Sequence, residues 1–339
     1  MSFIIQKPGF QTTLQDLGRF GYQQLGISVC GAMDLFAART ANLLLGNPEN
    51  APVLEMTMQG AVIDIAADAW ICICGADMQA ELNGARLPLW RPAAVKAGSR
   101  LQMHRAHLGV RAYLAVSGGF EAEDMIGSAR TELKEGFGGF HGRVLHKGDQ
   151  LALKPLERRM RKRWEEAFQA ERDGASFASA DWSLSPYSRP NYRDEPVIRF
   201  VRGREADWFA DEAFHALTHS LFRVSPQSDR MGYRLEGTPL AVTEKREMLS
   251  EAVTAGTVQV PPSGQPIVLM ADRQTTGGYP RIAQVIQADL PVLAQTQPGK
   301  RMGFVEVTFE EAESLLLEQE DVLQQLKWAA AERWKGGEG

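Results

Sequence analysis

The sequence predicts a mainly β protein of two domains, and three observations support this. The chain has 339 residues, about twice the length of an ordinary domain. Its apolar segments are short and closely spaced, without the intervening helices that a parallel α/β sheet needs. The composition changes to charged and then Ser/Pro-rich residues over 156–195. We therefore expect an N-terminal domain at 1–155, a linker at 156–195, a C-terminal domain at 196–327 and a flexible tail at 328–339.

The N-terminal half is expected to contain mostly strands and one well-defined helix. Glycine-bearing or polar turns separate the strand candidates, which are 53–58, 61–65, 70–74 and 110–116. The helix is expected over 35–45. Asp34 is placed to cap its first turn, Gly46 to end it in a left-handed conformation, and Pro48 to prevent its continuation.

The C-terminal half repeats this pattern. Its strand candidates are 197–201, 257–260, 267–270, 282–285 and 301–307, and 207–217 resembles a helix. Thr308 and Glu311 form a capping-box pattern, which predicts a helix from there to about Lys327. The charged run at the start of the expected linker is compatible with a solvated helix.

Composition excludes several classes of protein. Lys and Arg total 37 against 42 Asp and Glu, giving a net charge of −5, whereas general nucleic-acid binders carry a basic excess. No apolar run approaches the roughly 20 residues that span a bilayer, and the first residues lack a secretory h-region. We expect a cytoplasmic protein without nucleic-acid or membrane partners, whose Cys30, Cys72 and Cys74 are reduced thiols.

Common catalytic motifs are missing from the sequence. It has no P-loop, no serine-hydrolase elbow and no set of residues spaced to bind a metal, so no metal site is predicted. The glycine-rich segment 136–142 does not fit the dinucleotide-binding spacing. It is interpreted as a tight turn between strands, with a close backbone approach to a ligand as the alternative. Cys72 and Cys74 are expected to lie in a strand buried on both faces.

Four polar segments are the candidates for chemistry. Segment 12–19 combines hydroxyl, amide, carboxylate and guanidinium groups, although it would also suit a hydrogen-bonded turn. Segment 30–34 lies at the start of the first helix, where free N–H groups favour anions, and where Asp34 would equally suit a plain cap.

The other two segments lie in the C-terminal half. Segment 228–234 offers two arginines suited to a carboxylate or phosphoryl group, or to a surface ion-pair cluster. Segment 272–280 follows a buried strand directly. Its glycine pair is expected to adopt backbone conformations closed to other residues, which favours a binding loop over a spacer.

Longer motifs in these segments resemble a known family. The runs TTLQDLGR, CGAMD, RMGYR and QTTGGYP, with LLGN, YLAVSGG and GQPIVLM, are similar to the biotin-dependent carboxyltransferase and allophanate hydrolase subunit 2 family. Within that family the chain most resembles the C subunit of prokaryotic 5-oxoprolinase. The resemblance implies two tandem cyclophilin-like β-barrel domains. It covers roughly 3–326 except 156–195, and it departs from the family pattern at 127–131.

The resemblance also implies an activity and partners. The activity is an ATP-dependent amidohydrolase that converts 5-oxo-L-proline to L-glutamate. The partners are a kinase-inhibitor-like B subunit and a lactam-utilisation-type A subunit, with ATP, and Mg²⁺ accompanying it, shared with a partner. One alternative is carboxyl transfer from carboxybiotin to a urea-like amide, which requires biotin on a separate carrier. The other is a non-enzymatic regulator that binds a kinase-inhibitor-like protein.

The expected site residues come from the four polar segments. The catalytic candidates are Asp34, Arg230, Tyr233 and Gln274. The candidates for binding substrate or phosphate are Thr13, Gln15, Asp16, Arg19, Gly31, Arg234, Thr275, Thr276, Gly277, Gly278 and Tyr279. Arginines and backbone N–H groups are suitable donors to phosphoryl oxygens. We expect loops of both domains to converge on one pocket, which a partner chain completes.

Overall fold

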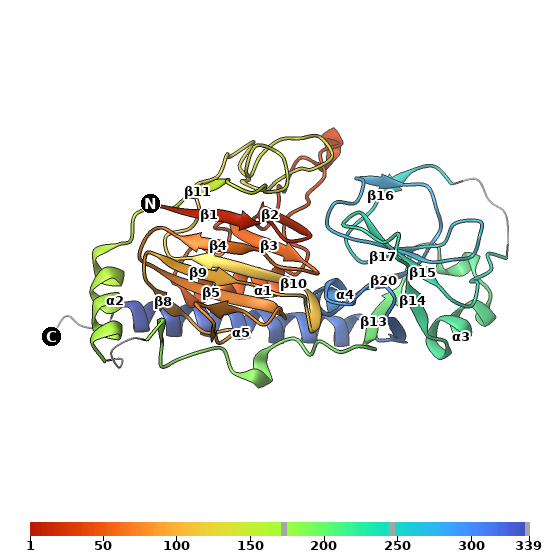
Figure 1. The fold of residues 1–339 in the computed structure, drawn as a ribbon. Coiled ribbons are helices and arrows are strands. Elements are labelled where there is room, and N and C mark those ends of the chain that lie inside the picture. Colours follow the sequence, from red (N-terminus) through yellow and green to blue (C-terminus); the bar gives the residue numbers. More distant parts are fainter. Residues whose placement is uncertain (171–174, 244–247, 336–339) are drawn as a thin grey trace. The chain divides into compact units, whose positions relative to one another are not determined.

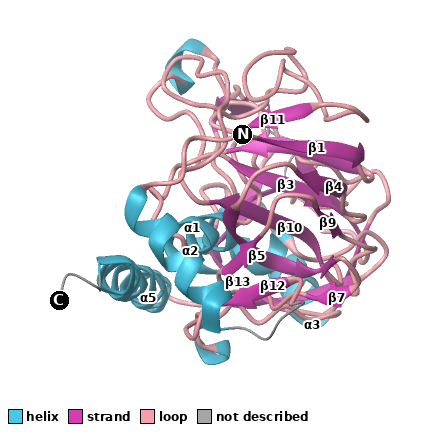
Figure 2. Ribbon diagram, turned by 60° about the vertical axis from the view of Figure 1, so that its left-hand side comes forward, coloured by secondary structure: helices cyan, strands magenta, loops and turns pink. Residues whose placement is uncertain are grey.

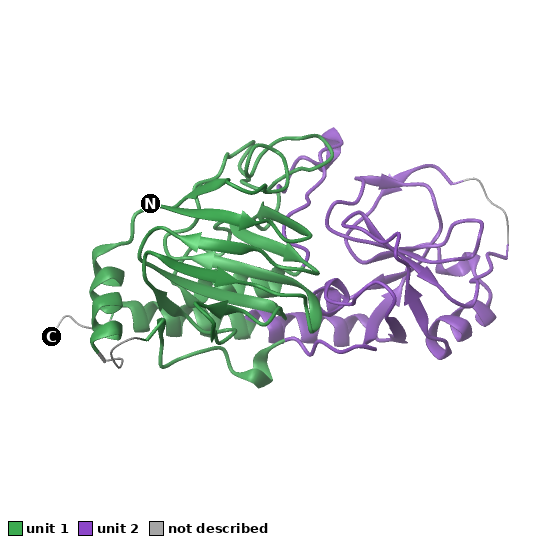
Figure 3. Cartoon of the chain, in the orientation of Figure 1, with its two compact units in different colours: residues 1–18, 34–189, 321–339 green, residues 19–33, 190–320 purple. Residues whose placement is uncertain are grey.

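The computed structural model describes residues 1–170, 175–243 and 248–335. Contacts divide the chain into two compact units, shown in different colours in Figure 3. Unit 1 comprises 1–18, 34–189 and 321–339, and unit 2 comprises 19–33 and 190–320. Both units are mainly β, as the sequence predicts.

Unit 1 contains two antiparallel six-stranded sheets, and Figure 1 labels most of their strands. In sheet order, the first is β11 (Gln150–Ala152), β1 (Ser2–Lys7), β4 (Val62–Ile65), β9 (Ser99–Gln102), β6 (Glu81–Leu82) and β7 (Ala85–Arg86). The second is β12 (Phe177–Ser179), β8 (Ala93–Val95), β5 (Ala69–Asp77), β10 (Leu108–Val116), β3 (Val53–Thr57) and β2 (Gln11–Gln15). The four strands predicted in this half are confirmed, with small shifts at their ends.

The second sheet has one apolar face and one face that mixes polar with apolar side chains, because side chains alternate along each strand. Leu14, Leu54 and Leu114 belong to the main apolar core of unit 1. Helix α1 (Leu35–Leu44) contacts β5 and β10, and Figure 2 shows it beside these strands. The predicted start and end of this helix are confirmed, since Asp34 caps it and Gly46 follows with a φ of 69°.

The stretch expected to be a linker contributes secondary structure to unit 1, so that expectation is wrong. It holds α2 (Arg158–Ala170) and β12, which pairs with β8. The indole N–H of Trp164 donates to the Val95 carbonyl at 3.0 Å, and Met160 is buried. A few apolar side chains on one side of α2 therefore anchor this segment. They were not recognised in the sequence because charged residues surround them.

Unit 2 is built around a closed seven-stranded barrel. In barrel order its strands are β13 (Val197–Arg202), β20 (Arg281–Val285), β17 (Thr257–Gln259), β18 (Ile267–Leu269), β15 (Gly232–Glu236), β14 (Phe222–Val224) and β21 (Arg301–Glu306). A parallel pairing of β13 with β21 closes it. The five strands predicted in this half are confirmed.

Unit 2 also contains short elements outside the barrel. These are a ribbon of β16 (Glu251–Ala252) with β19 (Thr276–Gly277), the helices α3 (Asp211–His219) and α4 (Leu290–Ala294), and the 3₁₀ turns η1 (Gln23–Leu25), η3 (Ala206–Trp208) and η4 (Gln287–Asp289). A further 3₁₀ turn, η2 (Pro186–Ser188), belongs to unit 1. The helix expected at 207–217 is thus realised as η3 followed by α3.

The final helix, α5, spans Phe309–Lys335. Its predicted capping box is confirmed, because Thr308 and Glu311 exchange backbone-to-side-chain hydrogen bonds of 2.8 and 3.1 Å. The expected flexible tail is wrong as far as Lys335: Trp334 is buried and its indole N–H donates to the Leu44 carbonyl at 3.0 Å. The rest of that tail, 336–339, lies outside the described residues. Of the helices described, none combines the length and apolar character needed to cross a membrane.

Candidate functional site

A row of buried side chains crosses the mixed polar and apolar face of the second sheet in unit 1. Strand register places Thr13 opposite Glu55, Glu55 opposite Tyr113, and Tyr113 opposite Cys74. Residues paired in this way project to the same face of a sheet. All four are at most 2% exposed. The row is therefore a hydrogen-bonding surface largely shielded from solvent.

Tyr113 connects this row to the start of α1. Its hydroxyl donates to Glu55 Oε2 at 2.8 Å and accepts the backbone N–H of Asp34 at 2.8 Å. Burial raises the pKa of Tyr113 well above its usual value, and the charges of Glu55 and Asp34 raise it further. The phenol therefore stays protonated and acts as a fixed donor near neutral pH.

Asp34 serves as the N-cap that the sequence allowed. Its Oδ1 accepts the N–H of Ala37 at 2.9 Å, and the residue is fully buried. A carboxylate at this position satisfies a helix N–H that has no partner within the helix and interacts favourably with the helix dipole. The cap is confirmed, and the catalytic role expected for Asp34 stays a prediction.

The end of β2 brings two predicted site residues against the loop at 127–132. Asp16 accepts hydrogen bonds from the Ser128 hydroxyl at 2.8 and 2.9 Å and from the Ala129 N–H at 2.7 Å. Gln15 Nε2 donates to the Thr13 hydroxyl at 3.1 Å and to the Thr131 carbonyl at 3.3 Å. Thr13, Gln15 and Asp16 are thus brought together, although Asp16 is committed to holding this loop.

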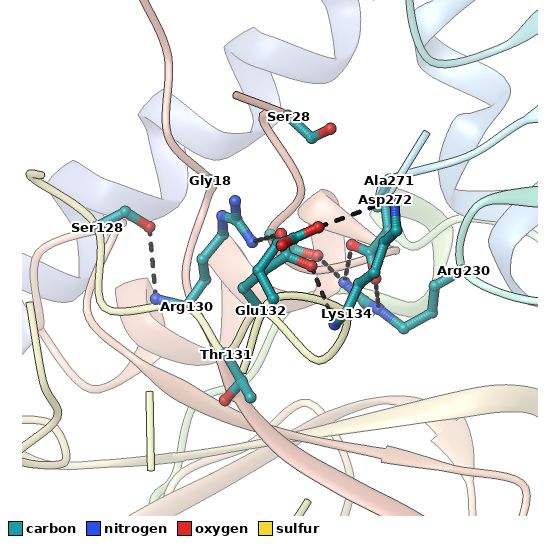
Figure 4. Close-up of polar contacts among 12 residues, drawn as sticks. Gly18, Ser28, Ser128, Arg130, Thr131, Glu132, Lys134, Arg230, Ala271 and Asp272 are labelled. Carbon is teal, nitrogen blue, oxygen red and sulfur yellow. Dashed lines mark hydrogen bonds and ion pairs between the residues drawn. The ribbon is translucent and has the colours of Figure 1, made fainter. Parts of the chain in front are cut away.

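The same loop carries a buried ion pair and explains the glycine-rich segment. Arg130 contacts Glu132 at 2.7 Å, and Figure 4 shows both side chains. A Cβ at Gly138 would lie 2.3 Å from the Arg130 carbonyl oxygen, and one at Gly139 would lie 2.0 Å from the Thr131 hydroxyl. Glycine is required because this segment packs directly on the loop. The interpretation of 136–142 as a turn is thereby refined to close packing against 130–131.

In unit 2, Arg230 joins two of the predicted segments. Its guanidinium contacts Asp272 through two hydrogen bonds, at 2.7 and 2.9 Å, drawn in Figure 4. It also donates to the Gly31 carbonyl at 2.6 Å. Gly31 and Cys30 both have positive φ, of 90° and 52°. Arg230 is 6% exposed, so this is a buried tether between loops, and the surface ion-pair cluster allowed by the sequence is not what forms there.

Three more of the predicted site residues, Tyr233, Arg234 and Arg19, lie in different environments. Tyr233, predicted to be catalytic, is a barrel-core residue whose hydroxyl donates to the Ala294 carbonyl at 3.3 Å. Arg234 follows it on β15 and is exposed, because successive side chains of a strand point to opposite faces. Arg230 and Arg234 therefore have different environments. Arg19 is buried in unit 2, and its N–H donates to the Val29 carbonyl at 2.9 Å.

The loop at 272–280 presents most of its predicted residues to solvent. Those that are exposed are Gln274, Thr276, Gly278 and Tyr279, while Thr275 and Gly277 are partly buried. The expected special backbone of the glycine pair is wrong, since neither glycine has a positive φ. A Cβ at Gly277 would lie 2.3 Å from Gln259 Nε2, the end of a flexible side chain, so Gln259 would have to shift to admit it.

An ion-pair network supports the base of this loop. Arg281 contacts Glu205 and also Glu251, the latter at 2.8 Å on β16. Burial opposes ionisation of Glu205, but hydrogen bonds and the charge of Arg281 outweigh it and lower the pKa of Glu205. The same partners raise the pKa of Arg281. The loop therefore emerges from a rigid, charged base.

Sequence reasoning missed Glu55, Tyr113, Ser128 and Glu205. Glu55 and Tyr113 lie inside strands that were identified by their apolar residues, so their polar partners were invisible without the register. A glutamate in an otherwise apolar strand was the available signal. In the ranges that the structure describes, no three or more His, Cys, Asp and Glu side chains are arranged to hold a metal ion.

Comparison with known proteins identifies the family. Residues 25–306 match the model of the carboxyltransferase domain, subdomain A and B. The chain belongs to this family. It is 42% identical over 330 residues to the C subunit of the 5-oxoprolinase of Escherichia coli, covering 96% of this chain and 97% of that protein. The equivalent protein of Haemophilus influenzae is 39% identical over 317 residues, covering 94% and 95%.

Solved structures give the same family. The Kluyveromyces lactis urea amidolyase aligns with a TM-score of 0.85 at 25% identity. The alignment covers 96% of this chain and 20% of the amidolyase. This family member therefore corresponds to about one fifth of that larger enzyme.

Proposed function

We propose that this family member is the C subunit of an ATP-dependent 5-oxoprolinase, working with a kinase-inhibitor-like B subunit and a lactam-utilisation-type A subunit. The single observation that carries the proposal is the likeness to the C subunit of the Escherichia coli 5-oxoprolinase, which covers 96% of this chain and 97% of that protein. The identity to yeast urea amidolyase is lower, 27%, and covers 17% of that protein.

The proposed reaction consumes one ATP and two waters for each lactam opened. Resonance stabilises the lactam, so water alone attacks it slowly. Transfer of the γ-phosphoryl group to the lactam oxygen forms ADP and activates the carbon. Water then adds to that carbon, the C–N bond breaks with proton transfer to nitrogen, and a second water releases phosphate. The products are L-glutamate, ADP and phosphate.

We assign this chain the task of holding the amide rather than the nucleotide. The polar row of unit 1 offers the hydroxyls of Thr13 and Tyr113, and Gln15 adds an amide beside Thr13. Such neutral groups suit the uncharged ring amide of the lactam. Arg230, expected to clamp a phosphoryl group, is already engaged by Asp272 and the Gly31 carbonyl. We therefore treat Arg230 as a positioning residue, and place ATP, with Mg²⁺, mainly on a partner subunit.

Reconstitution tests the proposal. The purified chain is mixed with its B and A partners, ATP, Mg²⁺ and 5-oxo-L-proline, and glutamate and ADP are measured. The proposal predicts that both products appear together and depend on all three proteins. The matched control contains the two partners alone. Product formation no higher than in that control would show the proposal to be wrong.

Carboxyl transfer is the second candidate, favoured by the family model and by the likeness to urea amidolyase. Under this alternative, a biotinylated carrier and a urea-like amide replace the ATP-dependent partners. Incubation with carboxybiotin and urea distinguishes the two, because only a carboxyltransferase forms a carboxylated amide. Glutamate formation without biotin supports the oxoprolinase.

A further inference from the structure

The side-chain amide of Gln15, at the end of β2, is fully buried and only partly hydrogen-bonded. Its Nε2 uses both hydrogens, on the Thr13 hydroxyl and the Thr131 carbonyl. Its Oε1 has no partner among the described residues. The opposite orientation of the amide would set two carbonyl oxygens against each other at Thr131, so the orphaned atom is the oxygen.

An orphaned acceptor of this kind requires an explanation. Leaving a buried polar atom unpaired is unfavourable, and folded proteins rarely do so without a role for it. Because Gln15 has no hydrogen left to donate, its oxygen is satisfied by a group that supplies an N–H or O–H, from a ligand or from a water. A carboxylate or phosphoryl oxygen would be repelled at this point, which argues against the phosphate-binding role expected for Gln15.

Thr13 supplies the complementary group. It lies two residues before Gln15 on β2, so both side chains share one face of the sheet. Its hydroxyl accepts the hydrogen bond from Gln15, which leaves the hydroxyl hydrogen to donate. The carboxylate opposite Thr13, that of Glu55, accepts the hydroxyl of Tyr113.

We propose that Gln15 and Thr13 together bind the edge of a cis amide, with the N–H donating to Gln15 Oε1 and the C=O accepting from the Thr13 hydroxyl. In a lactam or a urea, the N–H and C=O lie on the same edge, so two neighbouring groups bind both. In an ordinary trans amide these groups point in opposite directions. The inference rests on the proposed function for its choice of lactam, and it assigns the lactam-binding atoms.

The test begins on the ligand side, where no variant has to fold. Binding to the full chain is measured by calorimetry for 5-oxo-L-proline, for its N-methyl derivative and for the trans amide N-acetyl-L-alanine. Loss of the N–H leaves Gln15 Oε1 unpaired, so we expect the N-methyl compound and the trans amide to bind at least about tenfold more weakly.

Variants then locate the site. Thr13→Val keeps the shape of the side chain and removes the donor, and Gln15→Met removes the acceptor. Each should weaken 5-oxo-L-proline binding about tenfold. Gln11→Met is the matched control, because Gln11 lies on the same strand and face but outside the pair, and its binding should equal that of the native chain. Circular dichroism verifies that each variant folds.

The outcomes separate this inference from the proposed function. Equal affinity for the N-methyl compound, affinity unchanged in both variants, or no lactam binding would overturn the inference, leaving a buried water as the partner of Gln15. Selective cis-amide binding without ATP-dependent turnover in the reconstituted mixture would support the inference and contradict the proposed reaction.

Discussion

Replacing Asp272 by Asn tests whether Arg230 is a buried tether. The carboxylate and guanidinium make two contacts of 2.7 and 2.9 Å, and their side chains are 15% and 7% exposed. Asn keeps the shape but removes the charge, so the buried Arg230 loses this counter-ion. Such a loss costs about 3–5 kcal/mol of unfolding free energy.

An exposed pair in the same unit provides the matched control. Arg202 and Glu306 make a similar side-on contact at 2.8 Å, but their side chains are 53% and 39% exposed. Solvent screens this pair, and Glu306→Gln should cost no more than about 1 kcal/mol.

The assay is urea unfolding followed by hydrogen exchange in peptides from β15 and β18. Exchange is recorded by peptide because two units need not unfold as one. We expect the Asp272 variant to lower the stability of these strands much more than the Glu306 variant. Equal, small losses for the two variants would refute the view that Arg230 holds the loops together, and would return it to the group of available phosphate-binding arginines.

Three further predictions concern stability. Trp334→Ala should cost about 3–5 kcal/mol in urea unfolding, because the indole is buried. Trp328→Ala, at an exposed position of the same helix, should cost less than about 0.5 kcal/mol. Equal losses for the two variants would contradict the packing of the last turn. Gly277→Ala should cost no more than about 1 kcal/mol in urea unfolding, because the end of the Gln259 side chain can move away from the new Cβ. A loss of about 3 kcal/mol or more would contradict this view of Gln259. The pKa of Glu205 is lowered in the fold, so the stability that its ionised form contributes is complete above about pH 4.5 and is lost as the pH falls through the lowered value. Glu205→Gln should reduce this loss of unfolding free energy, measured from about pH 6 to about pH 3. An unchanged pH profile would show that other carboxylates dominate.

The sequence predicted local features of the fold well. The cap at Asp34, the stop at Gly46 and the capping box at Thr308 depend on neighbouring residues alone, and the structure contains all three. Alternation and turn residues were enough to locate the strands. Trp334 was misjudged because its burial depends on contacts with residues far away in the sequence, such as Leu44.

The candidate site was predictable only in part, for the same reason. Gln15 was singled out for its polar neighbours, but its orphaned oxygen follows from contacts with Thr131, more than a hundred residues away. Tyr233 was selected from a polar motif, yet strand alternation turns it into the barrel core. Glu55 was overlooked because its role appears only once the strands are paired.

The most direct test of the proposed function is ATP hydrolysis stimulated by 5-oxo-L-proline in the complex of this chain with its two partner subunits. We predict that ADP and glutamate form in equal amounts, and that Thr13→Val raises the lactam concentration needed for half-maximal rate while Gln11→Met does not. Hydrolysis that 5-oxo-L-proline fails to stimulate above the rate of the two partners alone would contradict it.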